Sequence, residues 1–177
     1  TRWSAQRNDS TVESEPTTRW LGATYAGELP SGAFGVSRSG GFGFTLNWVG
    51  PTDVLCPGVA RGFVSRSLLD AESFDDATSV ITTRAKMSSG HNYQLYKFTE
   101  PVAVSNVEVA PNGLYAVRPI GKDVFFHANQ YVTLTIPQSK SNSSMHRIAR
   151  VKQILSATTP KTTHDLLHIL GDQEDHP

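Results

Sequence analysis

Short apolar runs separated by turn residues dominate the chain after Trp20. Apolar and β-forming residues fill the segments 20–27, 33–37 and 42–49, and glycine, proline and serine cluster between them. Runs of this length bounded by such turns are typical of antiparallel strands. The Arg-Ser-Gly-Gly turn at 38–41 joins the second run to the third. The pattern therefore predicts a three-stranded meander.

The spacing of the apolar positions then changes. Apolar residues recur at helical spacing over 59–69, which predicts an amphipathic helix. A second helix is expected to begin at Ser73, because a serine side chain can cap a helix. The carboxylates of Asp75 and Asp76 also suit the positive end of that helix. The apolar pattern continues this helix to about Arg84.

A second block repeats the order of strands and helices. Four strand-like runs precede an apolar helical pattern over 145–155 and a last helix that starts near the capping residue Thr163. The predicted strands are 92–98, 103–110, 114–118 and 124–128. Strands and helices grouped in separate blocks predict a layered α+β fold rather than alternating βαβ units.

The charge balance argues against two broad classes of function. The 177 residues carry 16 Lys+Arg and 16 Asp+Glu, whereas nucleic-acid-binding modules usually show a basic excess. Neutrality leaves no attraction to an anionic membrane, and the apolar runs are shorter than the roughly 18 residues of a membrane span. We therefore expect neither nucleic acid nor membrane as a partner. No leader or span is visible, so the compartment stays open, with the cytoplasm favoured.

The composition predicts one folded domain. Hydrophobic residues make up 38% of the chain and charged residues 18%, a balance that can build a core and argues against wholesale disorder. Residues 1–19 are polar and are expected to form an arm or linker. The domain itself is expected to span 20–177.

The sequence contains no strong general motif for catalysis or metal binding. The one cysteine, Cys56, excludes an internal disulfide and a zinc site built on several thiolates. Thr1 stands where an N-terminal nucleophile would stand, but the residues after it are too polar for the buried strand that such a nucleophile opens. His164 and His168 lie four residues apart without a His-Glu-x-x-His motif, which favours a solvated helix face. We predict no metal site and no cofactor.

An ordered set of segments carries a family resemblance. The segments are 25–30 (YAGELP), 33–36 (AFGV), 41–48 (GFGFTLNW), 61–69 (RGFVSRSLL), 73–77 (SFDDA), 105–111 (SNVEVAP), 126–131 (FHANQY) and 166–172 (LLHILGD). In this order and spacing they resemble the isopenicillin-N acyltransferase-like family of N-terminal-nucleophile hydrolases, also called the acyl-CoA:6-aminopenicillanic-acid acyltransferase family. Within it they look closest to the Tan-type N-β-alanyl-amine hydrolases. The resemblance covers about 20–177, the central portion of such an enzyme.

The resemblance implies a fold and a reaction. Family members form an αββα four-layer sandwich and are made as precursors that cut themselves before a cysteine. The new N-terminal cysteine attacks an amide or thioester carbonyl, and its own α-amine accepts the thiol proton. The implied substrate of the intact parent is a small N-acyl amine, with β-alanyl among the acyl groups considered.

Four residues are candidates for the site, two of them by their match to the family. By resemblance, Asn129 is the side-chain donor to the oxyanion and Asn47 lines the nucleophile pocket; the alternative is that both only cap strand ends. Strand alternation leaves two choices for Glu108: an inward carboxylate that supports the site or contacts a substrate amine, or a solvent-facing residue. His127 is expected to shape the strand that holds Asn129, without an acid–base role.

The chain also departs from the family pattern. No cysteine opens a strand upstream of Trp20, and the chain ends at Pro177, before the family's last strands. Cys56 is no substitute, because it has no free amine. We therefore expect a fragment or truncated form, which is inactive alone because the nucleophile is absent. Its sheet is expected to have unpaired edges. A second chain that supplies the missing strands can cover them. The alternative is a non-catalytic scaffold or interaction protein derived from the family.

Overall fold

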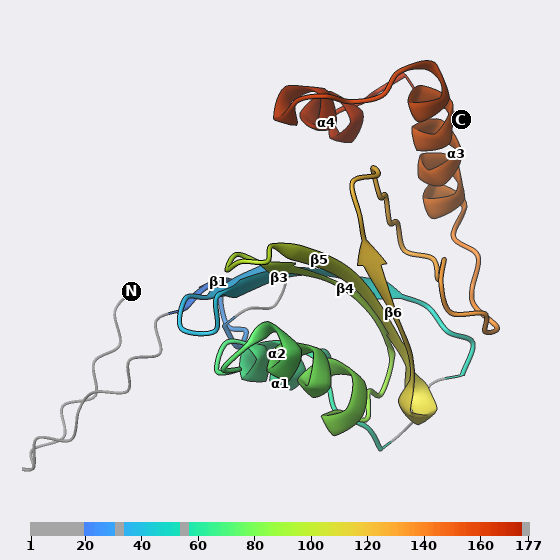
Figure 1. The fold of residues 1–177 in the computed structure, drawn as a ribbon. Helices are drawn as coiled ribbons and strands as arrows, with labels where there is room; N and C mark the ends of the chain where they lie inside the picture. Colours follow the sequence, from blue (N-terminus) through green and yellow to red (C-terminus); the bar gives the residue numbers. More distant parts are fainter. Residues whose placement is uncertain (1–19, 31–33, 54–56, 175–177) are drawn as a thin grey trace, which may run out of the picture.

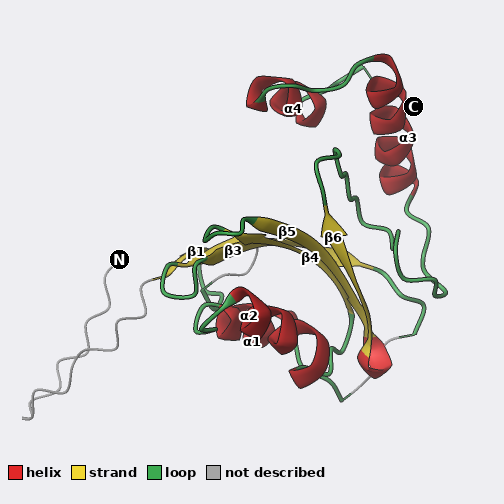
Figure 2. Cartoon of the chain, viewed as in Figure 1, coloured by secondary structure: helices red, strands yellow, loops and turns green. Residues whose placement is uncertain are grey.

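A six-stranded antiparallel sheet lies at the centre of the computed structural model, which describes residues 20–30, 34–53 and 57–174. Each strand pairs with its neighbours in sequence (Figure 1). The strands are β1 (Trp20–Ala23), β2 (Phe34–Ser37), β3 (Phe42–Val49), β4 (Gly90–Lys97), β5 (Ala103–Ala110) and β6 (Leu114–Ile120). Helices lie on both sides of the sheet, which confirms the predicted α+β class (Figure 2). The predictions for 1–19 and for Cys56 lie outside the described residues.

The first three strands form the predicted meander. β1 ends four residues earlier than expected, because the chain turns at Gly27, which has a φ of +87°. The turn between β2 and β3 lies where the sequence predicted it and depends on Gly41, which has a φ of +64°. A Cβ atom at Gly41 would lie only 2.7 Å from the Cγ2 atom of Thr99. Glycine is therefore required at this turn for both its backbone angle and its size.

Two helices cover one face of the sheet. They are α1 (Arg61–Leu68) and α2 (Phe74–Ser79), and both lie where the sequence predicted a helix (Figure 1). Ser73 caps α2 as predicted, because its side chain accepts a hydrogen bond from the N–H of Asp76 at 3.0 Å. The core between these helices and the sheet includes Phe42, Phe44, Leu68, Ile81, Tyr93, Leu95 and Val107. This packing fixes which face of each strand points away from α1 and α2.

The second predicted helix changes type halfway along. The α-helical part ends at Ser79, and Val80–Arg84 continues as one turn of π-helix. The hydroxyls of Thr82 and Thr83 bond to backbone oxygens four residues earlier, at 2.8 and 3.1 Å. Such back-bonding by β-branched residues competes with regular helix geometry. The predicted extent of the helix, to about Arg84, is confirmed, but its last turn is π-helical.

The segment 124–128 is not a strand. β4, β5 and β6 confirm the other three predicted strands, but after Ile120 the chain leaves the sheet and no strand pairing involves 124–128. Its apolar composition resembled a strand because 125–128 are partly or fully buried, and 124–127 line a cavity together with residues of the sheet and α4. Strand propensity reflects half-buried packing, which a loop lying across a sheet can also supply.

Two further helices lie on the other side of the sheet. α3 (Asn142–Ala157) and α4 (Thr163–Leu170) follow the long loop (Figure 1). The cap of α4 is Thr162 rather than Thr163, because Thr162 and Asp165 form a reciprocal capping box. Within the described ranges, no helix is long and apolar enough to cross a membrane.

A buried histidine under α1 makes the fold sensitive to acid. His91 of β4 is 4% exposed, and its Nδ1 atom has no hydrogen-bond partner among the described residues. Burial, reinforced by the positive charge of Arg61 and opposed by the backbone of Ser89, lowers the pKa of His91 to about 4. The folded state therefore keeps His91 neutral at pH values where the unfolded chain already binds a proton.

The sign of this linkage gives a measurable prediction. Because the folded pKa lies below the unfolded value of 6.5, stability is lost as the pH falls from 6.5 towards 4. We expect the free energy of unfolding to drop by about 2 kcal/mol from this group between pH 7 and pH 5. Urea denaturation at both pH values, compared with His91→Phe, isolates the effect. An equal drop in the variant would show that His91 is not responsible.

Candidate functional site

The sheet face turned away from α1 and α2 carries a row of polar side chains. In the strand register, Asn47 of β3 lies opposite Asn92 of β4, and Asn92 lies opposite Glu108 of β5. Successive side chains of a strand point to opposite faces, so these three share one face, while the neighbouring Leu46, Tyr93, Val107 and Val109 pack in the core on the other face. The loop 126–134 crosses this row and supplies the remaining groups of the site.

Glu108 anchors the loop to the sheet. Its fully buried carboxylate accepts hydrogen bonds from the backbone N–H groups of Val132, Thr133 and Leu134 at 2.7, 2.9 and 2.6 Å. Nε2 of His127 lies 2.9 Å from the same carboxylate. Burial acts to raise the pKa of Glu108, but the His127 contact and the three backbone donors hold it below its ordinary value. Of the two orientations left open by the sequence, the structure has the inward one.

His127 connects Glu108 to Asn47. The carboxylate accepts only, so the ring proton lies on Nε2. Nδ1 then carries the lone pair, 3.4 Å from Nδ2 of Asn47. Nδ2 of Asn47 also donates a bond of 2.9 Å to the backbone oxygen of Ala128. Through these contacts His127 joins Asn47 to the buried carboxylate and to the loop.

Two asparagines that sequence reasoning did not select extend this network. Nδ2 of Asn92 donates to Oδ1 of Asn47 at 3.1 Å, and Nδ2 of Asn106 donates to Oδ1 of Asn92. Both residues are fully buried. Asn47 therefore uses its oxygen and both amide hydrogens inside the protein. The available sequence signal was polar residues in otherwise apolar strands, but the cross-strand register that aligns them is a tertiary property.

Asn129 lies on the same loop with a different set of partners. Its Nδ2 donates to the backbone oxygen of Trp48 at 2.7 Å, and its Oδ1 accepts from Nη2 of Arg147 at 3.0 Å. An asparagine amide has two hydrogens, and the second N–H of Asn129 has no partner in the described part of the chain. Half-buried Asn129 thus keeps an unused neutral donor, whereas Asn47 does not.

The structure brings the four predicted site residues together. Asn47, Glu108 and His127 form one hydrogen-bonded chain, and Asn129 joins the same region through the backbone of Trp48. One expectation was wrong: His127 and Asn129 lie in a loop, not in a strand. The loop is fixed instead by the buried carboxylate beneath it. The roles assigned to the four residues by resemblance stay predictions.

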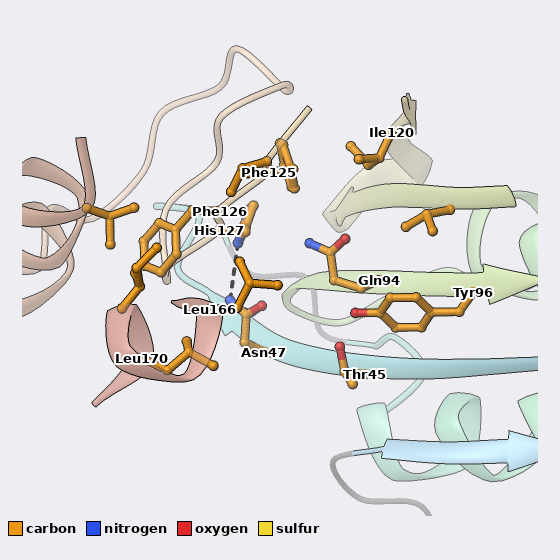
Figure 3. A pocket seen from close by; sticks show the side chains of 14 residues that line it. Thr45, Asn47, Gln94, Tyr96, Ile120, Phe125, Phe126, His127, Leu166 and Leu170 are labelled. Carbon is orange, nitrogen blue, oxygen red and sulfur yellow. Dashed lines mark hydrogen bonds between the residues drawn. The ribbon is translucent and has the colours of Figure 1, made fainter. Parts of the chain in front are cut away.

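A cavity of about 490 Å³ opens beside Asn47 and His127, as Figure 3 shows. Thr45, Gln94 and Tyr96 line its sheet side. The opposite wall is apolar and includes Phe125, Phe126, Leu166 and Leu170. Its lining in the described chain contains no carboxylate, ammonium or guanidinium group. The open side of the polar cluster therefore offers neutral hydrogen-bonding groups and apolar surface.

The site combines the side-chain amides of Asn47 and Asn129 with the buried carboxylate of Glu108, which fixes the loop beside them. A neutral N–H group held in place suits a negatively charged oxygen that develops during a reaction. Among the described residues, no group of three or more His, Cys, Asp and Glu side chains is placed to hold a metal ion. Of the four predicted site residues, Asn129 is the one with an unused side-chain N–H.

Comparison with known proteins gives one finding. A family model described as acyl-coenzyme A:6-aminopenicillanic acid acyl-transferase matches residues 4–177. The matched region includes the whole sheet, the loop 126–134 and the helices on both sides. No curated protein matches the chain.

Proposed function

The chain belongs to the acyl-coenzyme A:6-aminopenicillanic acid acyl-transferase family, and on this premise we propose that it supplies the oxyanion-binding part of a cysteine amidohydrolase or acyltransferase. The proposed substrates are small N-acyl amines, with β-alanyl amines among them. The proposed nucleophile is an N-terminal cysteine produced by autoprocessing. The observation that carries the proposal is the unused amide N–H of Asn129 beside the fixed Asn47 and His127.

The proposed reaction creates a negative charge that needs a donor. The α-amine of the cysteine, with a pKa of about 8 when free, accepts the thiol proton, and the sulfur attacks the carbonyl carbon. As the C–S bond forms, the carbonyl π electrons move to oxygen and produce the oxyanion. Its collapse breaks the C–N bond, and the amine leaves with the proton held by the α-amine. Water, or a second amine in a transfer reaction, then cleaves the thioester and restores the thiol.

The contacts suggest a division of roles among the site residues. Asn129 donates its unused N–H to the oxyanion, since a fixed neutral donor stabilises the charge as it develops. Asn47 forms a wall of the nucleophile pocket, and His127 orients it. Glu108 supports the loop instead of binding a substrate amine, because its carboxylate is fully buried and already accepts four N–H groups.

We propose that the complete enzyme is an αββα four-layer sandwich to which this chain contributes a partial domain over 20–177. The apolar side chains that border the cavity from α4 and from the loop after β6 are incompletely covered, since Val124 is 39% exposed, Leu166 43% and Leu170 73%. Further strands between the sheet and α4 would bury these side chains. Those strands would come from polypeptide outside the 177 residues or from a second chain.

In this proposal the chain is a fragment or truncated form and has no turnover alone. Its only cysteine, Cys56, stands inside the chain. The backbone nitrogen of Cys56 is bound in a peptide bond and cannot accept a thiol proton. The nucleophile must therefore be a cysteine that these 177 residues do not contain.

Intact-mass measurement and N-terminal sequencing of the native protein test this assignment. We expect a cysteine-led polypeptide that contains 20–177 and hydrolyses N-acyl amines, with activity lost when that cysteine is alkylated. The isolated 177-residue chain is expected to show no turnover. Turnover by the isolated chain that disappears on Thr1→Ala or Cys56→Ala would overturn the assignment. A native species of about 19.3 kDa that starts at Thr1 and lacks turnover would favour a non-catalytic scaffold.

A further inference from the structure

The side chain of Arg147 on α3 reaches the site loop. Its Nη2 atom donates to Oδ1 of Asn129 at 3.0 Å and to Oγ of Ser144 at 3.1 Å. Its Nε atom donates to the backbone oxygen of Ser143 at 3.2 Å. The two contacts within α3 hold the guanidinium in place, although the residue is exposed. Arg147 therefore presents a donor to Asn129 from a fixed position.

The partners of Asn129 select one orientation of its amide. The oxygen and nitrogen ends of an asparagine amide have nearly the same shape, so hydrogen-bond partners decide which end points where. The backbone oxygen of Trp48 requires an N–H, and the guanidinium of Arg147 requires an oxygen. Both requirements are met by the same orientation. That orientation leaves an N–H, and not a lone pair, on the unused side of the amide nitrogen.

A cationic donor also changes the strength of the amide. Hydrogen bonds from a guanidinium are stronger than neutral ones, and linked hydrogen bonds polarise one another. A positive charge at Oδ1 of Asn129 draws electron density from the amide nitrogen, and its free N–H becomes a better donor. Among the described residues, Arg147 forms no ion pair that would neutralise this charge, whereas Arg150, on the same helix, is bonded to Asp172 and Glu174.

We propose that Arg147 is a positioning residue that fixes the Asn129 amide in its donor orientation and polarises it for oxyanion binding. The inference rests on the proposed function for its catalytic consequence. Its structural consequence is independent of any turnover. The two can therefore be measured separately.

The structural arm uses the Asn129 side-chain amide signals in ¹⁵N–¹H NMR spectra of the 177-residue chain, assigned by their loss in Asn129→Asp. Arg147→Met is expected to shift these signals and to speed their hydrogen exchange, and Arg147→Lys to shift them only part of the way. Lys152→Gln removes one charge from an exposed position of the same helix and is expected to leave them in place. Unchanged signals in Arg147→Met would overturn the inference.

The kinetic arm uses the nucleophile-bearing protein. Arg147→Met is expected to lower kcat roughly tenfold with little change in KM, as is usual when a supporting partner of an active group is removed. Arg147→Glu is expected to lower kcat further. A carboxylate at this position accepts a hydrogen bond, so it favours the flipped orientation of the Asn129 side-chain amide, with the nitrogen toward residue 147. Unchanged kcat in both variants would overturn the inference. Unchanged kcat in Asn129→Ala would instead overturn the proposed function beneath it.

Discussion

Replacement of Glu108 by alanine is expected to lower the free energy of unfolding by about 3–5 kcal/mol. His127 and three backbone N–H groups of the loop share this carboxylate as their acceptor, in a site where the carboxylate is fully buried. Leaving such donors without a partner is expensive, and a domain is stable by only about 5–15 kcal/mol in total. Urea denaturation of the 177-residue chain, followed by tryptophan fluorescence, measures the effect.

Two further variants sharpen the Glu108 prediction. Glu108→Gln keeps the shape and one acceptor oxygen but turns an NH₂ group toward donors, so an intermediate loss is expected. Glu72 is exposed, and its replacement by alanine is expected to change stability by less than about 0.5 kcal/mol. A denaturation midpoint of Glu108→Ala equal to that of the unsubstituted chain would show that the carboxylate does not hold the loop.

Asn129→Ala is expected to lower kcat of the nucleophile-bearing protein by about 10²–10³-fold, the usual consequence of losing one oxyanion donor. KM is expected to change little, because the interaction strengthens only as charge develops on the carbonyl oxygen. Steady-state hydrolysis of an N-acyl amine series measures both constants. The thermal transition of the variant shows whether the fold has survived.

The matched control is Asn142→Ala. Asn142 is an exposed asparagine at the start of α3, away from the hydrogen bonds of the site, and its replacement is expected to leave kcat unchanged. If Asn129→Ala and Asn142→Ala had the same kcat, the oxyanion donor would have to be sought elsewhere. The hydrogen bonds around Asn47 would then have only a structural role, which is to stabilise the loop 126–134.

Local signals in the sequence were sufficient for most of the secondary structure. Ser73 marked the start of α2 because its side chain closes the first helical turn within four residues. Gly41 marked the β2–β3 turn because a positive φ and the nearby Thr99 exclude a larger residue. For Val80–Arg84 the same local signals gave the extent of the helix but not its π-helical type, and for 124–128 they led to a wrong element.

The sequence predicted only part of the candidate site. Family resemblance selected Asn47 and Asn129, and the residues around them pointed to Glu108 and His127, but neither gave their partners or the orientation of Glu108. Asn92, Asn106 and Arg147 were missed, because their contacts join residues 45, 14 and 18 positions apart in the chain, respectively, through strand register or across a loop.

The order of strands and helices, the main caps and turns, and the family could all be read from the sequence, because they depend on neighbouring residues and on an ordered set of motifs. Long-range contacts alone show that the polar side chains of β3, β4 and β5 share one face and that the loop 126–134 lies across them. Each of these buried polar groups is stable only when a distant segment satisfies its hydrogen bonds, so its place is fixed by the fold as a whole.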